Sequence, residues 1–211
     1  FFPQFVKTRT HVLRFTPLPP DAPVNCAEVL NKYDVTQPFF FLPNQFWRHK
    51  NHTVVIEALK LLPPEILVLA TGAIEDSRGS KHIDDILRRV SNYSLQLRFR
   101  MLGILPRQDM LALMTSAKCV LNPSLFEGWS TVVEESKFFG KRLILSDIPV
   151  HREQAPGGAI FFNPLNAAEL ADSMLSIWRE SDAGQEERAD AAQLQFPRAQ
   201  AEFAMKYWST A

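Results

Sequence analysis

The sequence is poor in cysteine and in long apolar runs, and both shortages narrow the class of protein. Its 211 residues include two cysteines, Cys26 and Cys119, whose separation fits no metal-ligand motif. Cys119 stands in an apolar run, so we expect it to be a small buried side chain in a protein of the reducing cytoplasm. No run approaches the roughly 18 apolar residues of a membrane-spanning helix. No signal peptide is visible either.

Net charge is also lacking, since 23 Lys and Arg residues balance 23 Asp and Glu residues. Nucleic acid is therefore not an expected partner, and any basic site must be local. The motifs G-x-G-x-x-G, G-x-x-x-x-G-K-[ST] and G-x-S-x-G are missing. Their absence weighs against a dinucleotide-dependent oxidoreductase, a P-loop NTPase and a serine hydrolase with a nucleophile elbow. The chain starts at Phe1 without an initiator methionine, and we expect it to be a fragment of a longer protein.

What the chain does contain is an alternation of short apolar runs and amphipathic segments. The runs, each expected to be a strand, are residues 11–15, 38–42, 66–70, 95–102, 119–121, 142–146 and 159–162. Most are apolar throughout, as strands of a parallel sheet covered on both faces must be, whereas residues 95–102 alternate and are expected to be half exposed. Helical stripes lie between them, at residues 54–62, 83–90 and 110–117. This repeat predicts βαβ units, and hence an α/β, Rossmann-like domain with a doubly wound parallel sheet.

The proline-rich residues 17–23 predict a stiff connector, so we expect residues 1–23 to be an N-terminal segment and linker. Residues 24–211 then form the Rossmann-like domain. After residue 166 no further strand is expected. Three trailing helices are predicted there instead, at about residues 166–180, 184–194 and 197–208.

In open α/β sheets, ligands bind beyond the carboxyl ends of the strands. Unusual polar clusters follow the predicted strands at residues 43–52, 71–79, 103–109, 122–131 and 146–153. Gly72 and Gly103 are strand-end glycines where a base or ribose can approach closely. His151, in the last cluster, is expected to make a loop contact, and Asp84 and Asp85 are expected on a solvated helix face.

The stretch 121–140, LNPSLFEGWSTVVEESKFFG, contains the most informative cluster. Gly128 allows a tight turn, and Ser130 and Thr131 favour a helix start at about Thr131, with Glu134 as the partner in a capping box. The free N–H groups of that helix start form an anion site, suited above all to phosphate. Glu127 and Glu135 lie on either side of it. They either accept hydrogen bonds from the hydroxyls of a nucleotide sugar or only complement the helix dipole.

A basic cluster, NQFWRHKNH, follows the predicted strand 38–42 and precedes a helix expected from about His52. Arg48 and Lys50 supply local positive charge, and a lysine suits a diphosphate. The alternative is a solvated loop with Phe46 and Trp47 in the core. His49 and His52 lack a third ligand nearby, so no metal site is expected.

The segment NPSLFEGWSTVVEE resembles the P-S-x-x-E-G-[FW] and Glu-x7-Glu motifs of a large family of GT-B glycosyltransferases, called group 1 or family 4. NQFWRHKNHTVVIEAL resembles the phosphate-binding loop and helix of that family. The resemblance runs from about Pro38 to Pro164. It implies one of two Rossmann-like domains, the C-terminal one, which binds a nucleotide diphosphate sugar and requires no metal or other cofactor.

The resemblance also implies roles for individual residues. Glu135 would hold the ribose hydroxyls, and Glu127 would contact the donor sugar. The backbone of Gly128, Trp129, Ser130 and Thr131 would receive the diphosphate, and Lys50 would neutralise the leaving group. Gln45 stands near the place of a family arginine, with Arg48 as its candidate replacement. The backbone around Gly103–Leu105, which includes Ile104, is expected to meet the base.

For the whole protein, the resemblance implies a retaining hexosyltransferase with a further N-terminal domain that binds the acceptor. It is compatible with a cytoplasmic enzyme that works at the inner membrane face on a membrane-associated acceptor. The chain alone is then expected to bind donor weakly and to transfer little. A sugar-nucleotide epimerase, a phosphorylase and a non-catalytic nucleotide-binding module remain as alternatives.

Overall fold

The computed structural model describes residues 16–17, 24–74, 81–154, 159–181 and 184–210. The strand predicted at residues 11–15 and most of the predicted linker lie outside these residues. Over the described chain, no helix has both the length and the apolar composition needed to cross a membrane.

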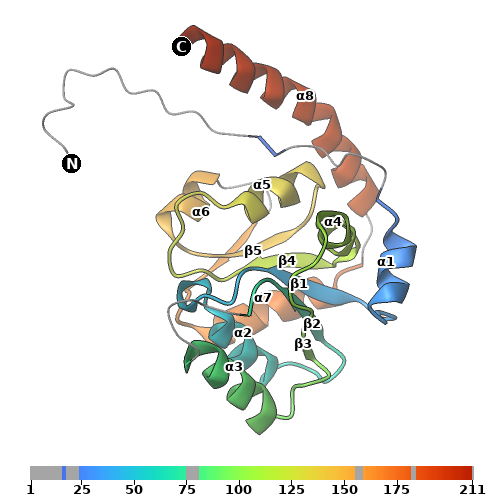
Figure 1. Ribbon diagram of the computed structural model, residues 1–211, viewed down its shortest axis with the longest axis vertical. Helices are drawn as coiled ribbons and strands as arrows, with labels where there is room; N and C mark the ends of the chain where they lie inside the picture. Colours follow the sequence, from blue (N-terminus) through green and yellow to red (C-terminus); the bar gives the residue numbers. More distant parts are fainter. Residues whose placement is uncertain (1–15, 18–23, 75–80, 155–158, 182–183, 211) are drawn as a thin grey trace, which may run out of the picture.

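A six-stranded, all-parallel sheet forms the centre of the domain (Figure 1). Its strands are β1 (Phe39–Pro43), β2 (Leu67–Thr71), β3 (Phe99–Met101), β4 (Cys119–Asn122), β5 (Leu143–Ser146) and β6 (Ile160–Phe162). They lie in the order β3-β2-β1-β4-β5-β6, so the chain builds outward from β1 on one side and then returns to the other. The predicted Rossmann-like class is confirmed, and the switch in direction falls between β1 and β4.

Helices cover both faces of this sheet. They are α1 (Cys26–Lys32), η2 (Arg48–Lys50), α2 (His52–Leu59), α3 (Lys81–Asn92), α4 (Arg107–Ser116), α5 (Thr131–Phe138), α6 (Pro149–Gln154), α7 (Ala167–Arg179) and α8 (Gln185–Thr210). Side chains alternate along β1, so Phe40 and Leu42 pack with α2, α3 and α7, whereas Phe39 and Phe41 pack with α1, α4 and α5. Cys119 is fully buried, as expected, and burial raises the pKa of its thiol to about 12.

The prediction for residues 95–102 was only partly right. Phe99–Met101 form β3, but the preceding residues fold as turns, because Leu95 N–H bonds to Val90 O and Phe99 N–H bonds to Leu95 O. Leu95 is buried and Leu97 is 87% exposed. The alternation in the sequence therefore came from turns, which imitate the period of a half-exposed strand.

The prediction of three trailing helices was also wrong, because the structure has two. Asn166 caps α7 by accepting hydrogen bonds from Ala168 N–H and Glu169 N–H. The next helix, α8, continues through Pro197, where a break had been expected. A proline has a helical φ and removes one backbone hydrogen bond, and Pro197 is exposed, so no packed neighbour forces the chain to turn there. In Figure 1, α8 passes α5 and extends beyond the sheet.

Candidate functional site

The two loops that follow β1 and β4 meet at the switch point of the sheet, where ligands bind in open α/β folds. Leu125 N–H bonds to His49 O at 2.7 Å and joins the two loops directly. Asn51, in a left-handed conformation between η2 and α2, donates from Nδ2 to Pro123 O at 3.1 Å and to Pro164 O at 2.8 Å. These bonds fix the basic loop against the glutamate loop.

Lys50 and Glu127 form an ion pair at this junction. Lys50 Nζ lies 2.6 Å from Glu127 Oε1, and the two side chains are only 14% and 8% exposed. Ser124 Oγ lies 2.7 Å from the same carboxylate oxygen and donates to it. The sequence singled out both charged residues, but their direct contact, across 77 positions of the chain, was not predicted. Arg48, by contrast, is exposed and does not line the pocket described below.

Helix α5 begins at Thr131, as predicted, and Ser130 is its N-cap. Ser130 Oγ accepts a hydrogen bond from Val133 N–H at 3.4 Å. The capping-box assignment of Glu134 was wrong, because with Ser130 as the cap the box position belongs to Val133. Glu134 instead accepts from Gln154 Nε2 at 2.8 Å and pairs with Lys137 Nζ at 2.9 Å. The loop that carries Glu127 leads directly into α5, and Thr131 and Val132 at the helix start line the pocket described below. The free N–H groups of such a helix start can receive an anion.

Glu135, just after the first turn of α5, pairs with Arg107 at the start of α4. Arg107 Nη1 lies 2.6 Å from Glu135 Oε1, and the side chains are 49% and 12% exposed. Arg107 was not predicted. The only signal for it was its place in the polar segment 103–109, after a predicted strand.

A pocket of about 360 Å³ opens between these elements, at the carboxyl ends of β1 and β2. Its lining residues are Pro43, Asn44, Gln45, Trp47, Lys50, Thr71, Gly72, Ile104, Leu105, Arg107, Met110, Thr131, Val132 and Glu135. Six residues named from the sequence are among them: Gln45, Lys50, Gly72, Ile104, Thr131 and Glu135. The apolar side chains of Met110 and Val132 in the lining were not predicted, and Leu105 was expected to contribute only its backbone. The alternative reading of the basic loop placed Phe46 and Trp47 in the core. Phe46 is buried there, whereas Trp47 is only partly buried and lines the pocket.

Gly72 lines the wall of this pocket, and Gly103 is bonded to it from outside the lining. Gly72 has a φ of +138°, and a Cβ there would lie 2.6 Å from Asn44 O, so only glycine lets the two loops approach. Gly72 N–H bonds to Gly103 O at 2.8 Å. Gln45 lies against the same wall, where its Oε1 accepts from Ala73 N–H at 2.5 Å. Gly128, Trp129 and Ser130 lie in the turn that leads to α5, outside the pocket lining.

Two buried histidines lie beneath the site. His52 stacks on Phe46, with ring centroids 4.3 Å apart, and burial lowers its pKa to about 3. His151 was expected in a loop but lies in the short helix α6, fully buried, and burial lowers its pKa as well. Both imidazoles are therefore neutral near pH 7. Within the described ranges, no group of three or more His, Cys, Asp or Glu side chains is arranged to hold a metal ion.

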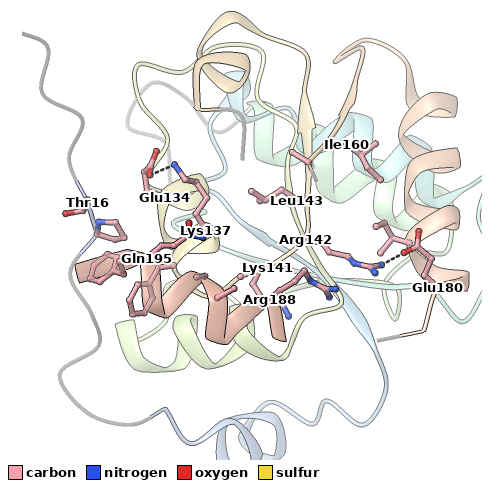
Figure 2. A pocket seen from close by; sticks show the side chains of 18 residues that line it. Thr16, Glu134, Lys137, Lys141, Arg142, Leu143, Ile160, Glu180, Arg188 and Gln195 are labelled. Atoms are coloured by element: carbon pink, nitrogen blue, oxygen red, sulfur yellow. Dashed lines mark hydrogen bonds and ion pairs between the residues drawn. The ribbon is translucent and has the colours of Figure 1, made fainter. Parts of the chain in front are cut away.

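A larger pocket of about 710 Å³ lies at the opposite end of the sheet, near the amino ends of β5 and β6 and under α8 (Figure 2). Its charged side chains are largely engaged, since Arg142 pairs with Glu180 at 2.5 Å and Lys137 pairs with Glu134 at 2.9 Å. The loops that carry Lys50 and Glu127 are at the other end of the strands. The smaller pocket at the switch point is therefore the candidate functional site.

Comparison with known proteins agrees with this geometry. The family model for glycosyl transferases group 1 matches residues 30–193. The chain is 24% identical over 168 residues to O-antigen chain mannosyltransferase B of Escherichia coli, covering 76% of this chain and 44% of that protein. It thus spans less than half the length of this curated relative.

Solved structures show the same fold. A glycosyltransferase from Rickettsia africae superposes with a TM-score of 0.76 at 21% identity, over 90% of this chain and 51% of that one. Anabaena HepE, solved in complex with UDP and glucose, superposes with a TM-score of 0.76 at 17% identity, over 89% of this chain and 53% of that one. The fold is thus that of half of a GT-B protein, and the chain belongs to the group 1 glycosyl transferases.

Proposed function

We propose that residues 24–211 form the donor-binding domain of a retaining glycosyltransferase that takes a sugar from a nucleoside diphosphate sugar. The observation that carries the proposal is the buried pair of Lys50 and Glu127, at the switch point of the sheet and beside the start of α5. Membership of the group 1 family supports it. So does the likeness to HepE, which was solved with UDP and glucose.

The diphosphate would lie against the start of α5, where helix N–H groups and the turn at Gly128 offer hydrogen-bond donors. Lys50 Nζ is a side-chain cation close to that turn, because it contacts Glu127, the residue just before Gly128. As the bond between the sugar carbon and the diphosphate oxygen breaks, negative charge grows on the leaving group. Lys50 and the helix start would stabilise that charge.

Glu127 would accept hydrogen bonds from hydroxyls of the donor sugar. Its partner Lys50 lines the pocket and can also pair with the negatively charged diphosphate. Arg48, the other strong base of these two loops, does not line the pocket. When donor binds, Lys50 would share its three N–H groups between Glu127 and the phosphates. The carboxylate and the cation would therefore orient the sugar and the leaving group relative to each other.

The nucleoside would occupy the pocket of about 360 Å³. Glu135 is placed on its wall to accept hydrogen bonds from ribose hydroxyls. The apolar side chains of Leu105, Met110 and Val132 would pack against the base. Residues 1–23 would link this domain to a second domain that supplies the acceptor, since the chain spans only 44% of its mannosyltransferase relative.

Nucleotide binding tests the first half of the proposal. We expect calorimetric titration of the folded protein to show that UDP, GDP or dTDP binds in a one-to-one ratio. The same nucleotide should protect the protein against thermal unfolding, since a ligand that binds only the folded state stabilises it. Failure of all three nucleotides to bind the folded protein would refute the proposed function.

Turnover by the whole protein tests the second half. Lys50→Ala and Glu127→Gln should each lower kcat by about 10²-fold or more, because each removes a group that acts on developing charge or on the reacting sugar. The partly exposed pair of Lys60 and Glu57, 3.0 Å apart at the C-terminal end of α2 and outside the pocket lining, offers the control. Lys60→Ala and Glu57→Gln should leave kcat unchanged. The anomeric configuration of the product, read by NMR, tests retention. If the protein were a non-catalytic module instead, Glu127→Gln would leave its biological function intact.

A further inference from the structure

A layer of buried polar side chains lies directly beneath Glu127, at the carboxyl ends of neighbouring strands. Asn122 is the last residue of β4 and Ser146 is the last of β5, and Ser124 and His151 follow these strands closely. All four are fully buried. Buried polar groups are costly unless they are hydrogen-bonded, so the partners of these side chains have to be accounted for.

The partners form a chain that begins at His151. His151 Nδ1 lies 2.9 Å from Ser146 O, and because a carbonyl oxygen can only accept, Nδ1 carries the proton. The Ser146 hydroxyl lies 3.1 Å from the same ring nitrogen and donates to Ser124 O at 2.5 Å. The side chain of His151 is thus bonded to the end of β5, which is bonded to the start of the glutamate loop.

The chain ends at Glu127. Ser124 Oγ donates its single proton either to Glu127 Oε1, at 2.7 Å, or to Asn122 Oδ1, at 2.8 Å. Asn122 Nδ2 in turn donates to Ser130 Oγ, the cap of α5, at 2.7 Å. The serine therefore joins the carboxylate to the same polar layer that fixes the start of α5.

Glu127 depends on this serine more than its ion pair suggests. Among the described residues, its carboxylate is hydrogen-bonded by Lys50 and Ser124. The two residues before it, Leu125 and Phe126, are 42% and 69% exposed. Lys50 is the contact that a diphosphate would draw away. Ser124 is neutral, so it would keep its bond to Glu127 when an anion enters the site.

We propose that His151 is a positioning residue for Glu127, acting through Ser146 and Ser124. This inference rests on the proposed function, because it assigns Glu127 to the donor sugar. His151 Nε2 is buried without a hydrogen-bond partner among the described residues, a cost that an apolar side chain in α6 would avoid. The histidine is retained, in this proposal, because its Nδ1–H group fixes Ser146, which in turn is bonded to Ser124.

The test compares variants that keep the Nδ1 donor with variants that lose it, all in the whole protein. His151→Asn keeps an N–H group near the place of Nδ1, whereas His151→Leu removes it. Ser124→Ala and Ser146→Ala break the later links. Ser136→Ala is the matched control, since Ser136 is an equally buried serine. Its hydroxyl donates to Met114 Sδ at 3.7 Å and, among the described residues, is not bonded to the polar layer.

We expect His151→Leu, Ser146→Ala and Ser124→Ala to lower kcat by about 10- to 100-fold, because a small misplacement of Glu127 slows the chemical step. The Kd for the nucleoside diphosphate should stay within about twofold, since that ligand does not need Glu127. His151→Asn should recover most of kcat, and Ser136→Ala should match the unaltered protein. The combined His151→Leu/Ser124→Ala variant should be little worse than either single variant, because both act on one chain.

Three results would overturn the inference. The first is an unchanged kcat in His151→Leu or, if that variant does not fold, in Ser146→Ala and Ser124→Ala. The second is a His151→Asn variant as slow as His151→Leu. The third is a parallel fall of kcat, nucleotide affinity and melting temperature, which would mean that the layer only supports packing. Nucleotide binding by the unaltered protein is measured first, so a failure of the proposed function is recognised separately.

Discussion

Among single residues, Arg107 was not predicted from the sequence. It carries a positive charge on the pocket wall and pairs with Glu135, an acid that the sequence did single out. Its pair with Glu135 is half exposed on the arginine side. Such a pair adds little to stability, typically less than about 1 kcal/mol. Its more important effect is on ligand binding, since Arg107 holds one oxygen of the carboxylate that is proposed to bind ribose.

Arg107→Gln should therefore weaken nucleoside diphosphate binding severalfold while leaving the melting temperature nearly unchanged. We also expect a smaller preference for UDP over 2′-deoxy-UDP, because a carboxylate that is less well fixed distinguishes the ribose hydroxyls less well. Calorimetry with the two ligands measures both effects. Arg88→Gln is the control, since Arg88 is 66% exposed and pairs with Asp85 on α3. An unchanged preference would mean that Arg107 does not position Glu135.

The sequence predicted some features of the site better than others. Glu127, Glu135 and Lys50 could be named because each stands in a recognisable local pattern, beside a helix start or after an apolar strand. The contact between Lys50 and Glu127 could not be predicted, because it depends on β1 and β4 lying side by side. Arg107 belongs to no motif, and only its distance from Glu135 singles it out.

At the scale of elements, the contact between α5 and α8 depends on one glycine. Gly140, just after α5, has a φ of +58°, and a Cβ there would lie 2.4 Å from Arg188 O in α8. Nearby, the rings of Phe138 and Phe196 pack edge to face, with centroids 4.4 Å apart. The backbone of α8 thus touches the turn after α5 directly, and no side chain fits between them.

Gly140→Ala should destabilise the protein by about 2 kcal/mol or more. Of this, about 1–2 kcal/mol comes from the left-handed conformation of a residue with a Cβ, and the remainder from moving α8 away. Urea denaturation followed by circular dichroism measures the change. Gly128→Ala is the control for stability, because a Cβ at Gly128 would meet nothing within 4 Å. Equal stability of the two variants would show that α8 does not pack there as closely as the structure indicates.

The sequence predicted the longer elements well and the short ones poorly. The strands of the sheet are buried on both faces, so their continuous apolar runs are distinctive. The six residues of α6 carry no helical period of their own, and their conformation depends on the burial of His151 and Gln154. Pro197 was expected to end a helix, but α8 continues through it. The preference of a single proline does not decide whether the packing of neighbouring elements requires a turn at that position.

At the scale of the whole molecule, the alternation of strands and helices predicted a doubly wound sheet but not the order of its strands. After β3 the chain crosses back to the other side of β1 and adds β4 there, so the strand order is set by the connection between β3 and β4. No residue in the sequence marks that crossing. Its consequence is functional as well as architectural. The crossing places β1 beside β4, and so brings together two polar loops that are 77 positions apart at Lys50 and Glu127.

The pH dependence of stability is a property of the whole molecule that His52 should dominate in mildly acidic solution. In the folded protein its pKa is lowered to about 3, mainly by burial, whereas in the unfolded chain it is near 6.5. Between these values the unfolded state binds a proton that the folded state does not. The free energy of unfolding therefore falls as the pH decreases from 6.5 toward 3, by at most about 1.4 kcal/mol per pH unit from this residue.

His52→Phe should flatten that dependence, because phenylalanine keeps a ring against Phe46 and does not titrate. Urea unfolding at several pH values between 4 and 7 measures the slope. His151, whose pKa is also lowered by burial, should leave a smaller slope of the same sign in the variant. An equal slope in His52→Phe and the unaltered protein would mean that His52 gains a proton in the folded state, which its complete burial opposes.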